Sequence, residues 1–289
     1  MKGIVLAGGS GTRLRPATLV IGKQLLPVYD KPMIYYPLST LIHAGCTDIL
    51  VITTQQEIAR LQQLLSFGDH FGLNIQFKVQ DEPRGVAHGI QIASEFISNE
   101  PFWFILGDNL FHGPDFGQEL RKFRKNSGAE GFAYYVSDPS SYGVAIFEEG
   151  REDLQGLVEK PNDFVSNWAI PGLYYFDDTC TERAKKLTPS NRGELEILDL
   201  LKSYFESGEL RINKVSRGNT WFDLGTSINL LRAAEFVQIV QERQGLLVGS
   251  PEEAAFNAGL LQLPELIEYF NDFGNQEYTN LIIESIQRH

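Results

Sequence analysis

The start of the chain constrains it most, because an apolar run at residues 3–7 opens directly into glycines and ends on Arg13. The apolar run predicts a buried strand, and Gly8 and Gly11 predict a tight turn after it. Glycine lacks a Cβ and adopts positive φ, so such a turn approaches a polyphosphate closely and its N–H groups form a concave anion site. Lys23 supplies a second cation. These residues predict a loop that holds a nucleoside triphosphate while one of its phosphoryl units is moved.

Two common phosphate-binding motifs fail at this loop. A Walker A loop ends on Gly-Lys-Ser/Thr, whereas Gly11 is followed by Thr12 and Arg13. The dinucleotide-binding motif G-x-G-x-x-G/A fails as well, because Leu14 stands at its third glycine position. The loop is therefore not that of a P-loop NTPase, and a dehydrogenase is the weakest enzyme class for this chain.

Strand-like and helix-like segments alternate in the first half of the chain. Apolar runs predict strands at residues 3–6, 49–53, 75–79 and 103–106, and helical spacing predicts helices at residues 34–43, 57–65 and 90–97. The alternation indicates βαβ units, and the continuous apolar strands indicate a sheet that is covered on both faces. We therefore expect an α/β fold with a Rossmann-like, mostly parallel sheet flanked by helices.

Three polar segments, residues 8–13, 80–89 and 107–109, directly follow predicted strands. Ligands of parallel sheets bind beyond the carboxyl ends of the strands, so these segments are expected to form one site. Asp108 lies in the third segment, and Asp223 follows another short apolar run. Either aspartate alone is also typical of a turn. Together they would suit Mg²⁺, which takes one or two carboxylates and completes its shell with substrate phosphates and water.

The pattern changes after about residue 130. Strand-like runs occur at residues 132–136, 144–147, 155–158 and 173–176, and helical spacing returns at residues 194–205, 227–241 and 251–287. We expect a mixed β extension that builds the substrate side of the cleft, followed by C-terminal helices. The predicted division is a core at residues 1–240, with a nucleotide-binding part at about 1–130 and a substrate-binding part at about 131–226, and a helical appendage at residues 241–289.

Charge and cysteine content exclude several classes of protein. The formal net charge of −12 argues against nucleic acid as a partner, because that polyanion favours a basic surface. Cys46 and Cys180 lie far apart without metal-ligand spacing, which is typical of a reduced, cytoplasmic setting. No stretch approaches the roughly 18 apolar residues of a membrane span, so no membrane partner is expected. The histidines show no zinc spacing, and the G-x-S-x-G elbow of a hydrolase does not occur.

A second set of candidate residues lies in the β-rich half of the chain. Glu159 and Lys160 end a predicted strand, where adjacent side chains point to opposite faces. They form either a surface ion pair or contacts to an anionic acceptor and its hydroxyls. Gly143 and Gly172 allow close backbone approach, and Tyr174 supplies either a core ring or an aromatic wall.

Six segments together give the chain its resemblance to a known family. They read LAGGSGTRL at residues 6–14, KQLLPVYDKPMIYYPLS at 23–39, LGDN at 106–109, VEKP at 158–161, RGELEI at 192–197 and WFDLGT at 221–226. On these segments the chain resembles the sugar-nucleotide pyrophosphorylases, most closely the glucose-1-phosphate thymidylyltransferases, over about residues 1–255. The glycine loop marks the superfamily, and the long segment at 23–39 is more specific.

The resemblance implies a Mg²⁺-dependent reaction of dTTP with α-D-glucose 1-phosphate that gives dTDP-glucose and pyrophosphate. The sugar phosphate is already an ionised nucleophile, so catalysis is mainly positioning and charge neutralisation. By position, the resemblance assigns Arg13, Lys23 and Lys160 to catalysis, Gly8, Gly11, Thr12, Gln24, Gln80 and Gly85 to nucleotide binding, Asn109, Gly143, Glu159, Gly172 and Tyr174 to sugar binding, and Asp108 and Asp223 to the metal. It also implies a homotetramer.

The chain departs from these relatives beside the expected nucleotide pocket. Arg84, His88 and Gly89 replace the usual residues of a Pro-Asp-Gly-Leu-Ala-Gln-Ala segment, which leaves the selectivity for thymidine open. The alternatives are a uridylyltransferase, a thymidylyltransferase for a modified hexose 1-phosphate, and a non-catalytic regulator that binds nucleotide sugars. Residues 251–259 contain no Arg or Lys, where relatives carry the basic residues of a regulatory nucleotide site, so we expect feedback inhibition by dTDP-sugars to be weakened or absent.

Overall fold

The fold was analysed in a computed structural model that describes the chain except residues 115, 124–126, 149, 272–273 and 289. The strands are β1 (Lys2–Leu6), β2 (Pro27–Val28), β3 (Lys31–Pro32), β4 (Asp48–Thr53), β5 (Asn74–Val79), β6 (Phe102–Leu106), β7 (Asn109–His112), β8 (Ala129–Tyr135), β9 (Gly143–Phe147), β10 (Leu154–Glu159), β11 (Trp168–Ala169), β12 (Leu173–Phe176), β13 (Leu210–Lys214) and β14 (Thr220–Asp223). The α-helices are α1 (Tyr35–His43), α2 (Ile58–Leu65), α3 (Val86–Ile92), α4 (Ser94–Ile97), α5 (Phe116–Arg121), α6 (Cys180–Lys185), α7 (Ile197–Glu206), α8 (Ser227–Gln244), α9 (Pro251–Asn257), α10 (Leu263–Asn271) and α11 (Gln276–Arg288). Short 3₁₀ turns are η1 (Thr12–Leu14), η2 (Ala17–Leu19), η3 (Lys23–Leu25) and η4 (Ser66–Phe71).

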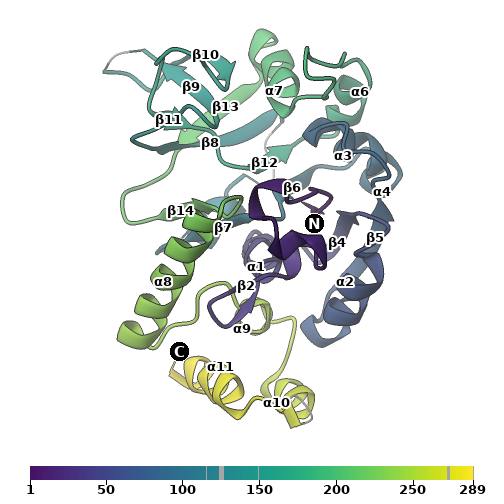
Figure 1. The fold of residues 1–289 in the computed structure, drawn as a ribbon, viewed down its shortest axis with the longest axis vertical. Helices are drawn as coiled ribbons and strands as arrows, with labels where there is room; N and C mark the ends of the chain where they lie inside the picture. Colours follow the sequence, from purple (N-terminus) through teal and green to yellow (C-terminus); the bar gives the residue numbers. More distant parts are fainter. Residues whose placement is uncertain (115, 124–126, 149, 272–273, 289) are drawn as a thin grey trace.

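A ten-stranded sheet runs through the centre of the molecule (Figure 1). Its order is β10-β9-β11-β8-β12-β6-β1-β4-β5, and β13 pairs with β8. Strands β6, β1, β4 and β5 are parallel neighbours, whereas β12 runs antiparallel between β6 and β8. Leu6 lies opposite both Ile52 and Leu106, so the loops after these strands leave the sheet at one edge. The expected parallel α/β sheet with a mixed extension is confirmed.

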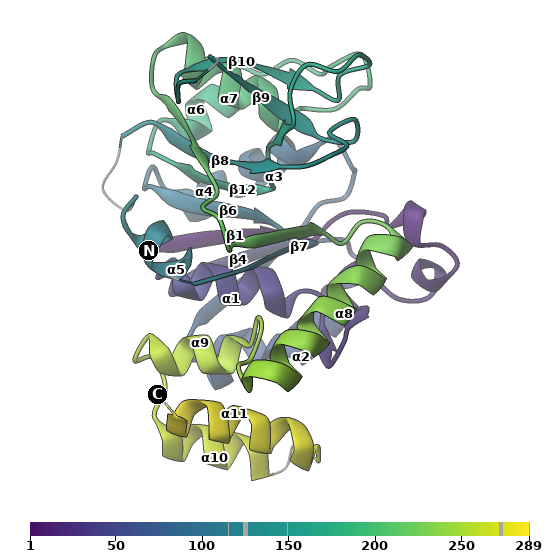
Figure 2. The ribbon, with the colours of Figure 1, turned by 90° about the vertical axis from the view of Figure 1, so that its left-hand side faces the viewer.

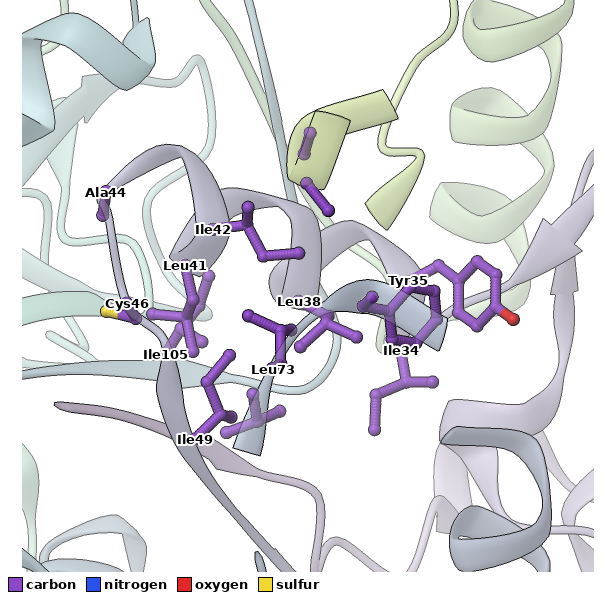
Figure 3. Packing of buried hydrophobic residues seen from close by; sticks show 14 of the residues in the cluster. Ile34, Tyr35, Leu38, Leu41, Ile42, Ala44, Cys46, Ile49, Leu73 and Ile105 are labelled. Atoms are coloured by element: carbon purple, nitrogen blue, oxygen red, sulfur yellow. The ribbon is translucent and has the colours of Figure 1, made fainter. Parts of the chain in front are cut away.

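Helices cover both faces of this sheet, because its strands are apolar on both sides. Val5 packs in one cluster with α1, which Figure 3 shows with Leu41 lying close to Ile49 and Ile105 of the strands. Ile4, the neighbour of Val5, belongs to a second cluster with α3 and α7. Each fully buried aliphatic side chain of this kind contributes about 1.5–3 kcal/mol to stability. The two clusters fix the sheet edge from which the site loops extend.

Several elements differ from the sequence-based expectation. The expected helix at residues 90–97 begins earlier, at Val86, because Gly85 with φ 97° ends the extended segment directly before it, and it is divided at Ala93 into α3 and α4. Strands β2, β3, β7, β11, β13 and β14 were not predicted. Strands β7 and β14 pair with each other outside the central sheet. Each has only four residues, which is too short for a periodic pattern to be recognised in the sequence.

The C-terminal part of the chain is helical, as expected. Helix α8 runs to Gln244, beyond the expected end at residue 241, and is capped by the Thr226 hydroxyl, which accepts from the Asn229 N–H at 3.3 Å, and by Gly245 with φ 64°. Helix α9 packs against α1, and α11 packs against α9 (Figure 2). Within the part of the chain that the structure describes, no helix is both long and apolar enough to cross a membrane.

Candidate active site

The loops after β1, β4 and β6 begin side by side at one edge of the sheet. The N–H of Ala7 donates to the carbonyl of Ile52 at 2.7 Å, and the N–H of Gly107 donates to the carbonyl of Leu6 at 2.9 Å. The glycine loop and the segment at residues 107–109 therefore start next to each other. The shared edge that the sequence predicted is confirmed.

Two glycines of the loop occupy positions that other residues would not fit. Gly11 has φ 59°, in the left-handed region, and its carbonyl accepts from the Thr18 hydroxyl at 2.7 Å. A Cβ on Gly8 would lie 2.5 Å from Oε1 of Gln80. Thr12 begins the short turn η1 directly after Gly11. The loop therefore closes tightly over the end of the sheet, where its N–H groups are available to an anion.

A cavity of about 530 Å³ opens between this loop and the segments after β4 and β5. Gly8, Lys23 and Gln80, all predicted to bind the nucleotide or its phosphates, contribute to its walls. Arg15 and Arg60 also line it and add two cations that the sequence analysis did not identify. The acidic side chains of Glu57 and Asp81 line it too, so the three basic residues are in slight excess, which suits a small anionic ligand in a concave site of this size.

Lys23 and Asp108 form an ion pair at the end of β6. The ammonium of Lys23 contacts Oδ2 of Asp108, and the two side chains are 10% and 15% exposed. Nδ2 of Asn109 donates to Oδ1 of the same carboxylate at 3.0 Å. Burial alone would raise the pKa of Asp108, but the charge and hydrogen bond of Lys23, with the bond from Asn109, hold that pKa below its usual range. Asp108 is therefore a carboxylate at neutral pH.

Asp223 reaches the same place because β14 pairs with β7. The antiparallel register puts Asp223 opposite Asn109, and the N–H of Leu224 donates to the carbonyl of Asp108 at 2.8 Å. Nη2 of Arg13 lies 4.0 Å from Oδ2 of Asp223. Burial and then the negative charge of Asp108 raise the pKa of Asp223, and Arg13 opposes the rise. Two carboxylates and two cations from four separate segments thus meet beside the glycine loop.

Asp108 and Asp223 are the residues that could hold a metal ion. Among the described residues, no three His, Cys, Asp or Glu side chains gather into a metal site. Mg²⁺ needs no such cage, because it is bound by one or two carboxylates together with substrate phosphates and water. The repulsion between the two carboxylates, which raises the pKa of Asp223, is the feature that a cation would relieve. The residues present therefore fit Mg²⁺ in the company of a nucleotide.

Asn109 is enclosed by protein contacts. Its Oδ1 accepts from the N–H of Gly172 at 3.0 Å and from Nε1 of Trp221 at 2.7 Å, while its Nδ2 donates to Asp108. Only 2% of the residue is exposed. The side chain therefore joins the turn after β6 to the start of β12 and to β14, which gives it a positioning role. A sugar contact would use its second amide hydrogen and stays a prediction.

The residues expected to contact the base lie after β5 and near the turn after β6. Nε2 of Gln80 lies 3.5 Å from the carbonyl of Gly85. Gly85 has φ 97°, and a Cβ there would lie 2.5 Å from the carbonyl oxygen of Leu195. Gln24 is buried, and its Cγ would lie 3.2 Å from a Cβ on Gly107. Gln80 and Gly85 are brought together, and Gln24 lies beside the phosphate side of the site.

Glu159 is the last residue of β10 in the mixed extension, and Lys160 follows it directly. Nζ of Lys160 and Nη2 of Arg192 lie 3.4 Å and 3.1 Å from Oε1 of Glu159. The expectation that the two adjacent side chains point to opposite faces is wrong, because Lys160 leaves the strand with φ 41°. A Cβ on Gly143 would lie 3.2 Å from Oε2 of Glu159. Tyr174 is buried, and burial and then the charge of Glu159 raise its pKa, so it lies in the core beneath this carboxylate.

Tyr142 connects this extension to the carboxylate pair. Its carbonyl accepts from the N–H of Lys160 at 3.1 Å, and its ring lies 5.2 Å from the ring of Trp221. Burial and then the charge of Asp223 raise the pKa of Tyr142. Lys160 and Asp223 therefore border the same region, although Lys160 itself contacts neither aspartate.

Sequence reasoning missed three arginines near the site. Arg15 and Arg60 line the cavity, and Arg192 holds Glu159. Arg192 had a signal, because it stands in the RGELEI segment. Arg60 had none, because it reaches the cavity only through the position of α2.

The chain is similar in sequence and in structure to known nucleotidyl transferases. The sequence matches the family model of nucleotidyl transferases over residues 2–239. A glucose-1-phosphate thymidylyltransferase of Mycolicibacterium smegmatis is 44% identical over 288 residues, covering 100% of both chains. A protein of the same name from Neisseria gonorrhoeae is 50% identical over 262 residues, or 90% of this chain and 91% of its own. The solved structure of a UDP-glucose pyrophosphorylase complexed with UDP-glucose has a TM-score of 0.73 and 25% identity, covering 84% of this chain and 99% of its own.

Proposed function

The chain belongs to the nucleotidyl transferase family, and we propose that it transfers the thymidylyl group of dTTP to α-D-glucose 1-phosphate, releasing pyrophosphate. The observation that carries the proposal is the group formed by Asp108, Asp223, Lys23 and Arg13 beside the glycine loop. Full-length similarity to proteins named glucose-1-phosphate thymidylyltransferase supports the choice of base and sugar.

The reaction needs charge neutralisation more than proton transfer. A phosphate oxygen of the sugar 1-phosphate attacks the α-phosphorus of dTTP. The bond from the α-phosphorus to the oxygen that bridges it to the β-phosphorus breaks, and pyrophosphate leaves with that electron pair. Arg13 and Lys23 supply fixed positive charge where negative charge builds up on the α-phosphate and the leaving group. The N–H groups around Gly8 and Gly11 add donors that are already oriented.

Asp108 and Asp223 would hold Mg²⁺, which when bound supplies further neutralisation of the phosphate charge. Lys23 keeps Asp108 ionised through its contact with that carboxylate. Nη2 of Arg13 lies 4.0 Å from Oδ2 of Asp223, while 58% of the Arg13 side chain stays exposed and could reach a bound phosphate. The two basic residues thus act both on the carboxylates and on the phosphates.

The mixed extension supplies the acceptor side of the proposed site. Lys160, whose side chain is 46% exposed, would anchor the sugar phosphate, and Glu159 would accept hydrogen bonds from hexose hydroxyls. A Cβ on Gly143 would lie 2.6 Å from Leu198 and one on Gly172 would lie 2.5 Å from Leu106, so these glycines let the backbone pack closely against the core, and a hexose would meet their main-chain atoms. The homotetramer implied by the resemblance is part of the same proposal and is tested by light scattering of the purified protein.

The test is pyrophosphate release with α-D-glucose 1-phosphate, Mg²⁺ and each of dTTP, UTP, CTP, ATP and GTP in parallel. We expect the fastest turnover with dTTP. Arg13→Met should lower kcat/KM by about 10²–10³-fold, the effect of removing one preorganised charge contact. Arg151→Met is the matched control, because Arg151 lies at the exposed β9–β10 turn, paired with Glu148. Equal turnover with UTP would mean that the enzyme does not select thymine over uracil. The absence of pyrophosphate release with every nucleotide would contradict the proposal.

A further inference from the structure

Arg15 lies in the wall of the nucleotide cavity, directly after the glycine loop. It is exposed and lines the cavity together with residues 8–10 of that loop. Its own N–H donates to the carbonyl of Thr12 at 3.3 Å, where the short turn η1 ends. Three residues further on, the Thr18 hydroxyl donates to the carbonyl of Gly11 at 2.7 Å. The backbone on both sides of Arg15 is therefore tied to the glycine loop.

Two other basic residues of the cavity wall are each held by a carboxylate. The ammonium of Lys23 contacts Asp108. Nη1 of Arg60 donates to Oε1 of Glu57 at 3.0 Å, which engages it on α2. In the part of the chain that the structure describes, the guanidinium of Arg15 makes neither an ion pair nor a hydrogen bond. Arg15 can therefore bind an anion in the cavity without breaking an existing contact.

The position of Arg15 along the cavity indicates which part of a nucleotide it would meet. Gln80 and Asp81 follow β5 and line the end of the cavity where the base is expected. Arg13 lies beside Asp223 of the carboxylate pair, where the reacting α-phosphate is expected. From there, a triphosphate continues away from the base and along the glycine loop. Arg15 follows that loop, so the phosphates beyond the α-phosphate are the ones within its reach.

We propose that Arg15 is a substrate-binding residue that holds the β- and γ-phosphates of the nucleoside triphosphate, which leave together as pyrophosphate. The proposal rests on the proposed function, in which this cavity binds dTTP. A guanidinium offers two parallel N–H groups to a phosphate, which is the geometry that this subsite requires. Because it contacts the leaving group and not the thymidylyl group, Arg15 contributes to the binding of dTTP and pyrophosphate, and not to the binding of dTMP or dTDP-glucose.

The first test is calorimetry, which gives the Kd of dTTP and of dTMP with Mg²⁺ and without the sugar phosphate. In Arg15→Met, the Kd of dTTP should rise by about tenfold, the lower end for a charge-assisted hydrogen bond because the residue is exposed. The Kd of dTMP should stay unchanged. Arg15→Lys keeps the charge but loses the paired N–H groups, so its Kd for dTTP should lie in between. Arg151→Met is the matched control for lost charge and should change neither Kd.

The reverse reaction, from dTDP-glucose and pyrophosphate, provides a second readout. In Arg15→Met, the KM for pyrophosphate should rise by about tenfold, while the KM for dTDP-glucose should stay unchanged. An unchanged Kd for dTTP overturns the proposal, as does an equal loss of affinity for dTTP and dTMP, or an equal effect of Arg15→Met and Arg151→Met. If the wild type turns over no nucleotide, the proposed function fails, and the Kd values of dTTP and dTMP still decide the role of Arg15.

Discussion

Asn109→Ala should destabilise the protein and lower its activity together, because this side chain links three parts of the site. Its removal leaves the Gly172 N–H and the Trp221 Nε1–H without the acceptor they share at 3.0 Å and 2.7 Å. An unpaired buried donor costs about 1–3 kcal/mol, so the two together cost about 2–6 kcal/mol. That is a large part of the roughly 5–15 kcal/mol that stabilises a typical fold. Asp108 also loses the hydrogen bond from Nδ2, so kcat should fall in the molecules that remain folded.

Equilibrium unfolding in urea measures the first effect, and pyrophosphate release at a temperature where the variant is folded measures the second. Asn74→Ala is the matched control, because Nδ2 of Asn74 donates to Asp48 at an exposed position. Its free energy of unfolding should change by less than about 0.5 kcal/mol, as is usual for surface substitutions. A loss below about 1 kcal/mol in Asn109→Ala would refute the reasoning, because it would mean that the two donors find other acceptors.

Three further substitutions separate charge, protonation and backbone conformation. Asp223→Asn should lower kcat/KM by about 10²–10³-fold. It should not lower the thermal midpoint, because it removes a buried charge that Asp108 repels. Kinetics and thermal unfolding of one sample test the two effects. Burial lowers the pKa of His43 to about 4, below about 6.5 in the unfolded chain. The folded state should therefore lose up to about 3 kcal/mol as the pH falls from about 6.5 to 4, and urea unfolding of His43→Gln should show a smaller loss. Gly85→Ala forces a side chain into φ 97° and toward the Leu195 carbonyl, so the KM for the nucleotide should rise; an unchanged KM would mean that this turn does not shape the pocket.

Much of the fold could be predicted because its main strands are continuous and apolar. Strands β1, β4, β5 and β6 stand out as runs that helices separate, and their parallel arrangement follows from that alternation. The short pair β7 and β14 could not be predicted, because each has four residues and neither shows a period. Their pairing joins segments that are far apart in sequence, and nothing local in either segment specifies it. The early start of α3 likewise depends on the packing of Gly85 against Leu195.

The candidate site was predictable where its residues follow strands, and not where tertiary pairing places them. The glycine loop and Asp108 follow β1 and β6, so the edge they share could be inferred from sequence alone. Asp223 gave little signal, because it reaches Asp108 only through the register that puts it opposite Asn109. The ion pair of Glu159 and Lys160 was one of the two arrangements expected from sequence, but the positive φ of Lys160 that forms it was not, because it occurs at a residue that is not glycine.

The chain is acidic overall, yet it can bind the proposed polyanionic substrate. Binding depends on the charges within the site, not on the net charge of the whole surface. A net charge of −12 describes the whole surface, whereas charges farther apart than a Debye length of about 8–10 Å are largely screened. Within the site, Arg13 and Lys23 balance Asp223 and Asp108, and on the cavity wall Arg15 and Arg60 balance Glu57 and Asp81, so the site is locally near neutral. A nucleoside triphosphate responds mainly to this local balance. It follows that neutralising Arg13 should weaken nucleotide binding far more than neutralising Arg151, although both changes alter the net charge equally.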